Sequence, residues 1–272
     1  AYISVESSIG DNFEFTAGVR QEEGLQQVNT YDLFSGVDSL IDKSIEEDYQ
    51  LPSMTLTYLP NFDENLQIRL GASQTIARPT FRELSPTLFI DVDTDRVIAG
   101  SLYLENSEID NIDLRLEYYF GFNQFFTAGI FSKEILNPIE ETVNESGDLI
   151  ITSYQNVPLA EINGFEIEYE QVFEAIMDSP NDLLVKFNYT ETESEVIVNP
   201  GDTYINSIGT VVDAQNLLAN GRDTRLQGQS DTIANFQIGL DNLQNQTQAT
   251  LIVNYVSDRV RARGIDVLPD II

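Results

Sequence analysis

The sequence contains no histidine and no cysteine. Without cysteine there is no disulfide framework and no thiolate metal site. Without histidine the chain lacks the usual general base, the usual zinc ligand and any Ser-His-Asp arrangement. Only carboxylate chemistry remains for catalysis, so the composition favours a protein that is not an enzyme and that carries no metal and no cofactor.

Basic residues are scarce as well. Fourteen lysines and arginines stand against 45 acidic residues, which gives a net charge of -31. Phosphate binding needs clustered Lys and Arg, so nucleic acid is a poor partner for this chain. Strong acidity also occurs in disordered chains, but an aromatic content of 10% and repeated apolar alternation indicate packed structure. The acidic residues are therefore expected on a solvated surface, in a lumen or in external loops.

The sequence also lacks the uninterrupted apolar run of about 18 residues that a transmembrane helix needs. Its apolar residues alternate with polar ones instead. For example, Leu66, Ile68, Leu70 and Ala72 are separated by Gln67, Arg69 and Gly71. A period of two is typical of a β-strand with one apolar face, and it recurs along most of the chain.

We expect about ten strands, near residues 2–9, 13–24, 46–59, 65–81, 111–120, 125–140, 149–173, 183–197, 231–241 and 248–261. Short and long links largely alternate between them. The long links are expected as external loops, at about 25–45, 82–110 and 198–230, with a further one at 262–272. Alternate links of antiparallel strands lie at opposite ends of a sheet. The pattern therefore predicts an all-β, antiparallel up-and-down segment of a transmembrane barrel, with tight turns at one end and long loops at the other.

Several segments carry a resemblance to a known family. Gln50 to Tyr58 reads QLPSMTLTY and resembles the "LPSxxLxY" strand of TonB-dependent receptors, which are outer-membrane active transporters. Ala77 to Pro86 is similar to the family's "aRPxfxeLsP" stretch, and Gly18 to Glu22 to its "GvRxE" strand. Downstream, two further segments resemble the "dPIe" segment and the "N…GvElE" return strand; they are Leu136 to Glu140, and Asn156 with Gly164 to Glu168.

These segments follow the family's order and together span most of the chain. One stretch departs from the pattern. Where the family often has "GNPxLxPE", Gly100 to Asn106 lacks the Asn-Pro pair. That departure leaves the expected fold unchanged but makes the conformation of this loop an open question.

The resemblance implies a barrel of the 22-strand type, preceded by a plug domain and a TonB box. About ten strands are not a whole barrel, so we expect a middle-to-late segment of the wall without the plug. The resemblance further implies a place in the bacterial outer membrane, in contact with lipid and lipopolysaccharide. It implies that the plug and the TonB complex are partners in the uptake of a scarce nutrient. Siderophore-bound iron, cobalamin, haem, sugars and peptides all fit, and the sequence does not choose among them.

Two sets of residues are candidates for function. Candidates for ligand contact in or near the expected loops are Arg78, Arg82, Tyr103, Tyr204, Arg222 and Arg225. Polar strand residues expected to face the lumen are Arg115, Glu117, Glu166, Glu168 and Glu170. Guanidinium groups recognise carboxylates well, so for the arginines the alternative is pairing with acidic neighbours.

Other interpretations stay open. Glu166, Glu168 and Glu170 share one strand face, and paired carboxylates also serve glycosidases, although the pleat alone brings such residues close. The stretch from Asp91 to Asp95 suggests calcium, but an EF-hand loop would need Gly and Glu where this chain has Arg96 and Leu102. At the level of the whole protein, the alternatives are a passive porin or adhesin barrel and a soluble secreted all-β binding domain.

Overall fold

The computed structural model describes residues 1–31, 40–92, 96–146, 149–174, 181–218, 222–242, 244–264 and 271–272. These residues are predominantly β-structure, with one four-residue α-helix and one short 3-10 helix. None of the helices among them has the length and apolar character needed to cross a membrane.

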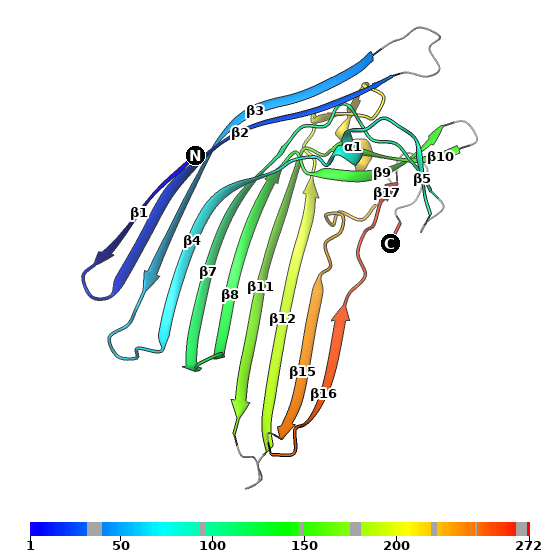
Figure 1. Cartoon of the computed structure of the whole chain (residues 1–272). Helices are drawn as coiled ribbons and strands as arrows, with labels where there is room; N and C mark the ends of the chain where they lie inside the picture. Colours follow the sequence, from blue (N-terminus) through cyan, green and yellow to red (C-terminus); the bar gives the residue numbers. More distant parts are fainter. Residues whose placement is uncertain are drawn as a thin grey trace.

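Ten long strands form one sheet (Figure 1). In order across the sheet they are β1 (Tyr2–Ile9), β2 (Phe13–Tyr31), β3 (Leu40–Tyr58), β4 (Leu66–Ala77), β7 (Ser107–Gly121), β8 (Gln124–Leu136), β11 (Leu159–Phe173), β12 (Asn181–Ile197), β15 (Thr232–Asn242) and β16 (Thr247–Val256). All neighbours pair antiparallel and their order follows the chain. The predicted up-and-down arrangement of ten strands is therefore confirmed. The sheet is open, with β1 and β16 at its edges.

The register aligns the apolar residues of all these strands on one face. One row of directly opposed residues runs through Leu56, Leu70, Leu114, Ile130 and Phe165. No second layer of described residues covers this row, and the exposed fractions of Leu70, Leu114 and Ile130 are 44%, 42% and 59%. The pleat sends the intervening polar residues to the opposite face. The sheet therefore has one apolar face and one polar face.

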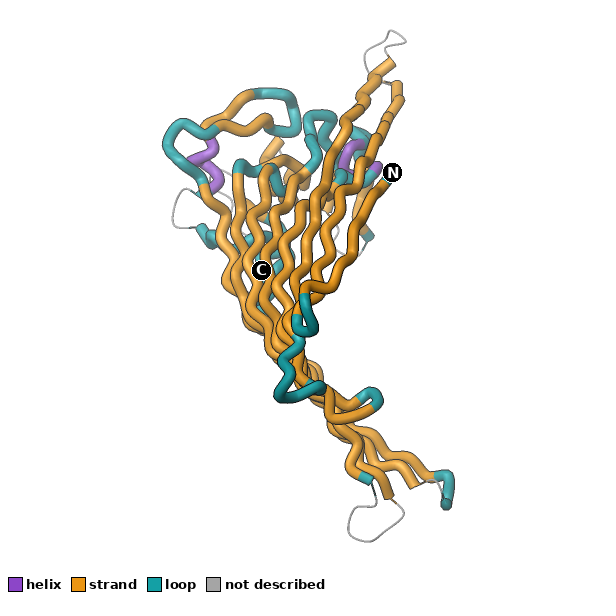
Figure 2. The backbone as a smooth tube through the Cα atoms, turned by 90° about the vertical axis from the view of Figure 1, so that its left-hand side faces the viewer, coloured by secondary structure: helices purple, strands orange, loops and turns teal. Residues whose placement is uncertain are grey.

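Short and long links lie at opposite ends of this sheet. Tight turns join β1 to β2, β3 to β4, β7 to β8 and β15 to β16 at the lower end in Figure 1. Three of them use left-handed backbone, at Gly10 (φ 65°), Asn123 (φ 54°) and Gln246 (φ 54°). The long links lie at the upper end. Figure 2 shows that both helical turns lie there too.

The expected loop at 25–45 needs correction. β2 and β3 continue as a paired ribbon as far as Tyr31 and Leu40, beyond the point where each leaves its other neighbour. β2 pairs with β1 only up to Arg20, and β3 with β4 only up to Ser53. Side chains in this ribbon are largely polar, so the apolar period that marks the other strands is missing here. Residues 32–39 lie outside the described residues.

The expected strands at 125–140 and 149–173 also need correction, because each contains a break. Pro138 and Pro158 lack a backbone N–H and interrupt the ladder. Asn137, just before the first proline, has a φ of 52°. Between the two prolines the chain leaves the main sheet and forms a separate hairpin, β9 (Ile139–Ser146) with β10 (Leu149–Asn156). The base of this hairpin is closed by the amide of Val157, which donates to the carbonyl of Pro138 at 2.9 Å.

The strands of this hairpin pair with short strands from the long links and so form a second sheet. A five-stranded sheet contains, in order, β17 (Arg263–Gly264), β9, β10, β6 (Arg96–Ile98) and β5 (Phe89–Asp91). The loop that precedes β5 contains α1 (Phe81–Leu84), and the link from β12 to β15 contains β13 (Thr203–Ile205), β14 (Val211–Asp213) and the 3-10 helix η2 (Ala214–Leu217). The segments at 82–110, 198–230 and 262–272, which we expected as long external loops, thus contain short regular elements.

Two small apolar clusters support this end of the molecule. In one, Ile45, Leu84 and Leu104 join the β2–β3 ribbon to α1 and the following loop. The other contains Val157, Ala160, Val196, Tyr204, Ala214 and Leu217. These cores are separate from the apolar face of the main sheet, so the loops hold their shape without packing on it.

A buried ion pair fastens the end of the described chain to β9. Arg263 and Glu140 are both fully buried, and the Arg263 Nε donates to Glu140 Oε2 at 2.5 Å. The same guanidinium donates to the carbonyls of Asp223 and Arg225 at 2.6 and 2.9 Å. The amide of Gln227 donates to Glu140 Oε1 at 3.1 Å. Three segments far apart in the sequence therefore meet at one pair of charges.

Replacing Arg263 with Met should loosen this junction, because Glu140 would stay buried without its cation. Loss of one partner of a buried pair costs about 3–5 kcal/mol, whereas replacing both with apolar residues costs much less. We expect Arg263→Met in the full-length protein to lose amide-exchange protection in β9 and β17, and Glu140→Leu combined with Arg263→Met to lose less. The exposed Arg259→Gln is the matched control. Unchanged protection in Arg263→Met would contradict this role.

Candidate functional site

The polar face of the main sheet carries a charged cluster centred on Arg115. This residue lies on β7, and its guanidinium is 2.9 Å from Glu168 and 3.5 Å from Glu166, both on β11. It is also 3.3 Å from Glu117, two residues along its own strand. The Thr127 hydroxyl accepts a hydrogen bond from Arg115 at 3.2 Å. Alternation along β7 and β11 places all these side chains on one face, and the register places them side by side.

Glu117 is the most buried carboxylate of the cluster, with a side chain that is 5% exposed. It lies 3.5 Å from Arg69 on β4 and accepts a hydrogen bond from the Tyr119 hydroxyl at 2.8 Å. Arg69 and Arg115 are directly opposite each other in the register. Two cations in that position would repel, so Glu117 between them is what allows both to stay on this face.

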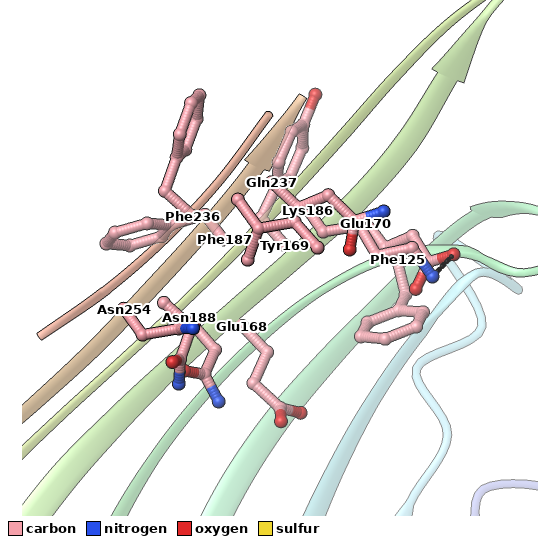
Figure 3. A pocket seen from close by; sticks show the side chains of 12 residues that line it. Phe125, Glu168, Tyr169, Glu170, Lys186, Phe187, Asn188, Phe236, Gln237 and Asn254 are labelled. Atoms are coloured by element: carbon pink, nitrogen blue, oxygen red, sulfur yellow. Dashed lines mark hydrogen bonds and ion pairs between the residues drawn. The ribbon is translucent and has the colours of Figure 1, made fainter. Parts of the chain in front are cut away.

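Beyond this cluster lies a shallow hollow that is lined by aromatic, charged and amide side chains (Figure 3). Glu170 pairs with Lys186 at 2.7 Å on the neighbouring strand β12. Asn188, Asn235 and Asn254 form one row across β12, β15 and β16, and the Asn235 amide donates to Asn188 at 2.7 Å. We did not single out these asparagines from the sequence. Each is an ordinary polar position in its own strand, and only the register lines them up.

The carboxylates Glu166, Glu168 and Glu170 each lie within 3.5 Å of a cation. A glycosidase acid is kept protonated by an apolar environment and faces a second carboxylate across the substrate. Here each of the three carboxylates is held by a neighbouring cation, and all three lie on one strand. The arrangement suits binding of polar groups better than proton transfer.

The candidates at the outer end fall into two groups. Arg78 follows β4 and pairs with Glu22 of β2 at 2.9 Å. Arg82 lies on α1 with its guanidinium 3.8 Å above the ring of Phe89. Tyr103 is 42% exposed, and its ring lies against Gly209 of the β13–β14 loop.

Three other candidates hold the loop together. Tyr204 is only 6% exposed and belongs to an apolar cluster, so it is a core residue and does not present its ring to a ligand. Arg222 donates to the carbonyl of Asn216 at 2.9 Å. Arg225 makes a fork with Asp223 at 2.6–3.0 Å and is also 3.2 Å from Asp231. Residues 93–95, the centre of the calcium interpretation, lie outside the described residues.

The junction between Arg225 and Asp223 predicts a pH dependence. Hydrogen bonds from Arg225 hold the pKa of Asp223 below its ordinary value. A carboxyl with a lowered folded-state pKa stabilises the loop above the unfolded pKa of about 4, and that contribution is lost as the pH falls through the folded value. Amide exchange in 222–231, corrected for its intrinsic pH dependence, should therefore accelerate below about pH 4. Asp223→Asn should be less protected at pH 7 and should respond less to acid; equal responses in both proteins would refute the assignment.

Comparison with known proteins places this geometry in a family. Residues 1–262 match the family described as TonB dependent receptor-like, beta-barrel. A double mutant of the Serratia marcescens hemophore receptor HasR, solved with its hemophore HasA and heme, has a similar fold, with a TM-score of 0.60 and 11% identity. That likeness covers 94% of this chain and 43% of HasR.

Two Pseudomonas aeruginosa receptors are similar in the same way. The siderophore receptor PirA gives a TM-score of 0.54 at 12% identity, over 94% of this chain and 40% of PirA. A mutant of the ferric enterobactin receptor PfeA, solved with enterobactin, gives 0.51 at 13%, over 96% of this chain and 41% of PfeA. A search of curated proteins by sequence gives no match. The chain thus spans less than half of each of these receptors, and it belongs to the TonB-dependent receptor family as part of its β-barrel domain.

Proposed function

We propose that this chain forms part of the wall and outer loops of an outer-membrane receptor that takes up a scarce nutrient in a TonB-dependent way. The observation that carries the proposal is the main sheet itself, which has a continuous apolar face without a covering layer and a charged face on its other side. Soluble proteins rarely leave so large an apolar surface uncovered. Lipid would cover that surface in a membrane, with lipopolysaccharide around its outer part.

The polar face would then line the lumen. Arg115, Glu117, Glu166, Glu168 and Glu170 would lie inside, where a plug domain and water meet the wall. Arg69, Arg115 and Lys186 pair with these four carboxylates and offset part of their charge. The amide row beside them offers neutral hydrogen-bonding groups. The plug, pulled by the TonB complex, would open the path past this wall.

The outer loops would make the first contact with the nutrient. Their short sheet and buried ion pair keep them ordered, as a recognition surface on a rigid scaffold requires. Arg78, Arg82, Tyr103 and Arg222 are the earlier candidates that lie outside the loop cores. The similar receptors are described with heme, a siderophore or enterobactin, so an iron-bearing ligand is the first class to test.

Uptake measurements test this function directly. Cells that produce the full-length receptor should take up at least one of three probes, iron as haem, iron as ferric enterobactin, or cyanocobalamin. We expect uptake to fall at least about tenfold when either the receptor gene or TonB is removed, because passage depends on force applied to the plug. A passive porin would keep its uptake without TonB, and that result would reject active transport.

Cysteine labelling tests the orientation. This chain has no cysteine of its own, and any cysteine elsewhere in the full-length protein is first replaced with serine. Thr210 lies in an exposed outer loop and Asn245 in the exposed turn between β15 and β16. Each is replaced with cysteine, as Thr210→Cys and Asn245→Cys. A membrane-impermeant maleimide should label position 210 in intact cells and position 245 only after the outer membrane is permeabilised. Equal labelling of both positions in intact cells would contradict a membrane-spanning wall.

A further inference from the structure

A second hollow lies at the outer end of the molecule, between the β2–β3 ribbon and the segment that contains α1 and β5. It has a volume of about 530 Å³, within the range of small-molecule sites. The side chains that line it include Gln27, Asn29, Phe81, Arg82, Ser85 and Thr87. The sequence did not connect Gln27 and Asn29 with the segment 81–89, because only the fold brings these two parts of the chain together.

The wall around Arg82 is well supported. α1 begins with a capping box, in which the Thr80 hydroxyl accepts from the amide of Glu83 and the Glu83 carboxylate accepts from the amide of Thr80. Leu84 anchors the helix in the cluster that also contains Ile45. On the opposite side, the Gln26 amide donates to the carbonyl of Pro79 at 2.7 Å, which ties β2 to the start of this segment.

The charge balance of this hollow is unusual for the chain. The protein has 45 acidic residues, yet among the described residues no carboxylate lines the hollow. Two acidic groups close to it are already engaged, since Glu83 caps α1 and Asp42 accepts from Gln27 at 3.0 Å. Arg82 makes no ion pair with any described residue, in contrast to Arg78, Arg115 and Arg225. The hollow is therefore a cationic spot on an acidic protein.

Aromatic rings define what else the hollow can contact. The ring of Phe89 lies 3.8 Å from Arg82 Cζ and covers one face of the guanidinium. The edge of the guanidinium, where its N–H donors lie, remains accessible to a partner. A planar fork of this kind binds a carboxylate through two parallel hydrogen bonds. Phe81 is 64% exposed beside it and offers an apolar surface. Hydroxyls of Ser85 and Thr87 and the amide of Asn29 supply further polar contacts.

We propose that this hollow, defined by Arg82, Phe81, Phe89 and Asn29, binds an organic carboxylate whose aromatic or aliphatic body packs against Phe81. The proposal rests on the proposed function, because it assigns the hollow to the nutrient side of the receptor. A free phosphate is a poorer fit, since it carries more charge than one guanidinium balances and has no apolar part to meet the exposed ring.

Binding of a small probe to the full-length receptor in detergent tests the proposal. The probe is 4-fluorobenzoate, followed by fluorine NMR line broadening, with 4-fluorobenzamide as the neutral analogue of the same shape. We expect the benzoate to bind and the benzamide to bind at least about tenfold more weakly, because a charge-assisted bidentate contact is lost. Inorganic phosphate at the same concentration should not displace the benzoate.

Variants assign the binding to this hollow. Arg82→Gln should weaken benzoate binding about tenfold, and Arg82→Lys should recover only part of it because the fork is missing. Phe81→Ala should weaken the binding of the benzoate, while the hollow should still prefer the benzoate over the benzamide. Arg259→Gln removes an exposed arginine outside the hollow and is the matched control, with no effect expected.

Three results would overturn the proposal. They are equal binding of benzoate and benzamide, displacement by inorganic phosphate, and equal losses in Arg82→Gln and Arg259→Gln. Each variant is first checked for the wild-type thermal unfolding transition. These measurements need no transport, so they can fail while TonB-dependent uptake is intact, and uptake can fail while benzoate still binds.

Discussion

The alternation of side chains across a single-layer sheet is the constraint on which the rest of this structure depends. Each of the eight inner strands of the main sheet has ladder partners on both sides, so these strands need no second layer to satisfy their backbone. The side chains of the sheet then divide into two faces, and the register decides that Leu56, Leu70 and Leu114 fall in one row. A slip of one residue would send an entire strand's apolar set to the polar face. The same register that builds the apolar face therefore also builds the cluster around Arg115.

The outer end of the molecule is stabilised in a different way. There the chain leaves the main sheet and gains no support from the apolar face, so it forms small cores of its own around Leu84 and Leu217. The fully buried pair of Glu140 and Arg263 adds a junction that apolar packing alone would not specify, because it joins three segments through directed hydrogen bonds. The result is a set of ordered loops at the end where a receptor of this family would meet its nutrient.

The arginines of this chain differ in role, because most stabilise the structure through ion pairs and Arg82 is placed to bind a partner. In a chain with a net charge of -31, most arginines of the described structure are held by nearby carboxylates. Arg115 stabilises the carboxylates of the wall, Arg225 stabilises a loop, and Arg263 stabilises the junction with β9. Arg82 differs because its closest support is an aromatic ring, which leaves its donors for a partner. The two kinds of surroundings look alike in a sequence, where every arginine has acidic residues within reach.

The sequence by itself determined the one-sided strands, their number, the sorting of short and long links, and the family. Those features are local, since a period of two, a proline and a tight turn are each read within a few residues. The prediction of strand boundaries was wrong where the chain lacks an apolar period, as in the ribbon formed by β2 and β3. It was also wrong where a proline divides one alternating run into two strands, as between β8 and β9. Only the tertiary structure decided that Tyr204 is a core residue, that Asn188, Asn235 and Asn254 form a row, and that Gln27 and Arg82 share a hollow. Such contacts join positions far apart in the chain, and they follow from strand register and loop packing, which leave no periodic signal in the sequence.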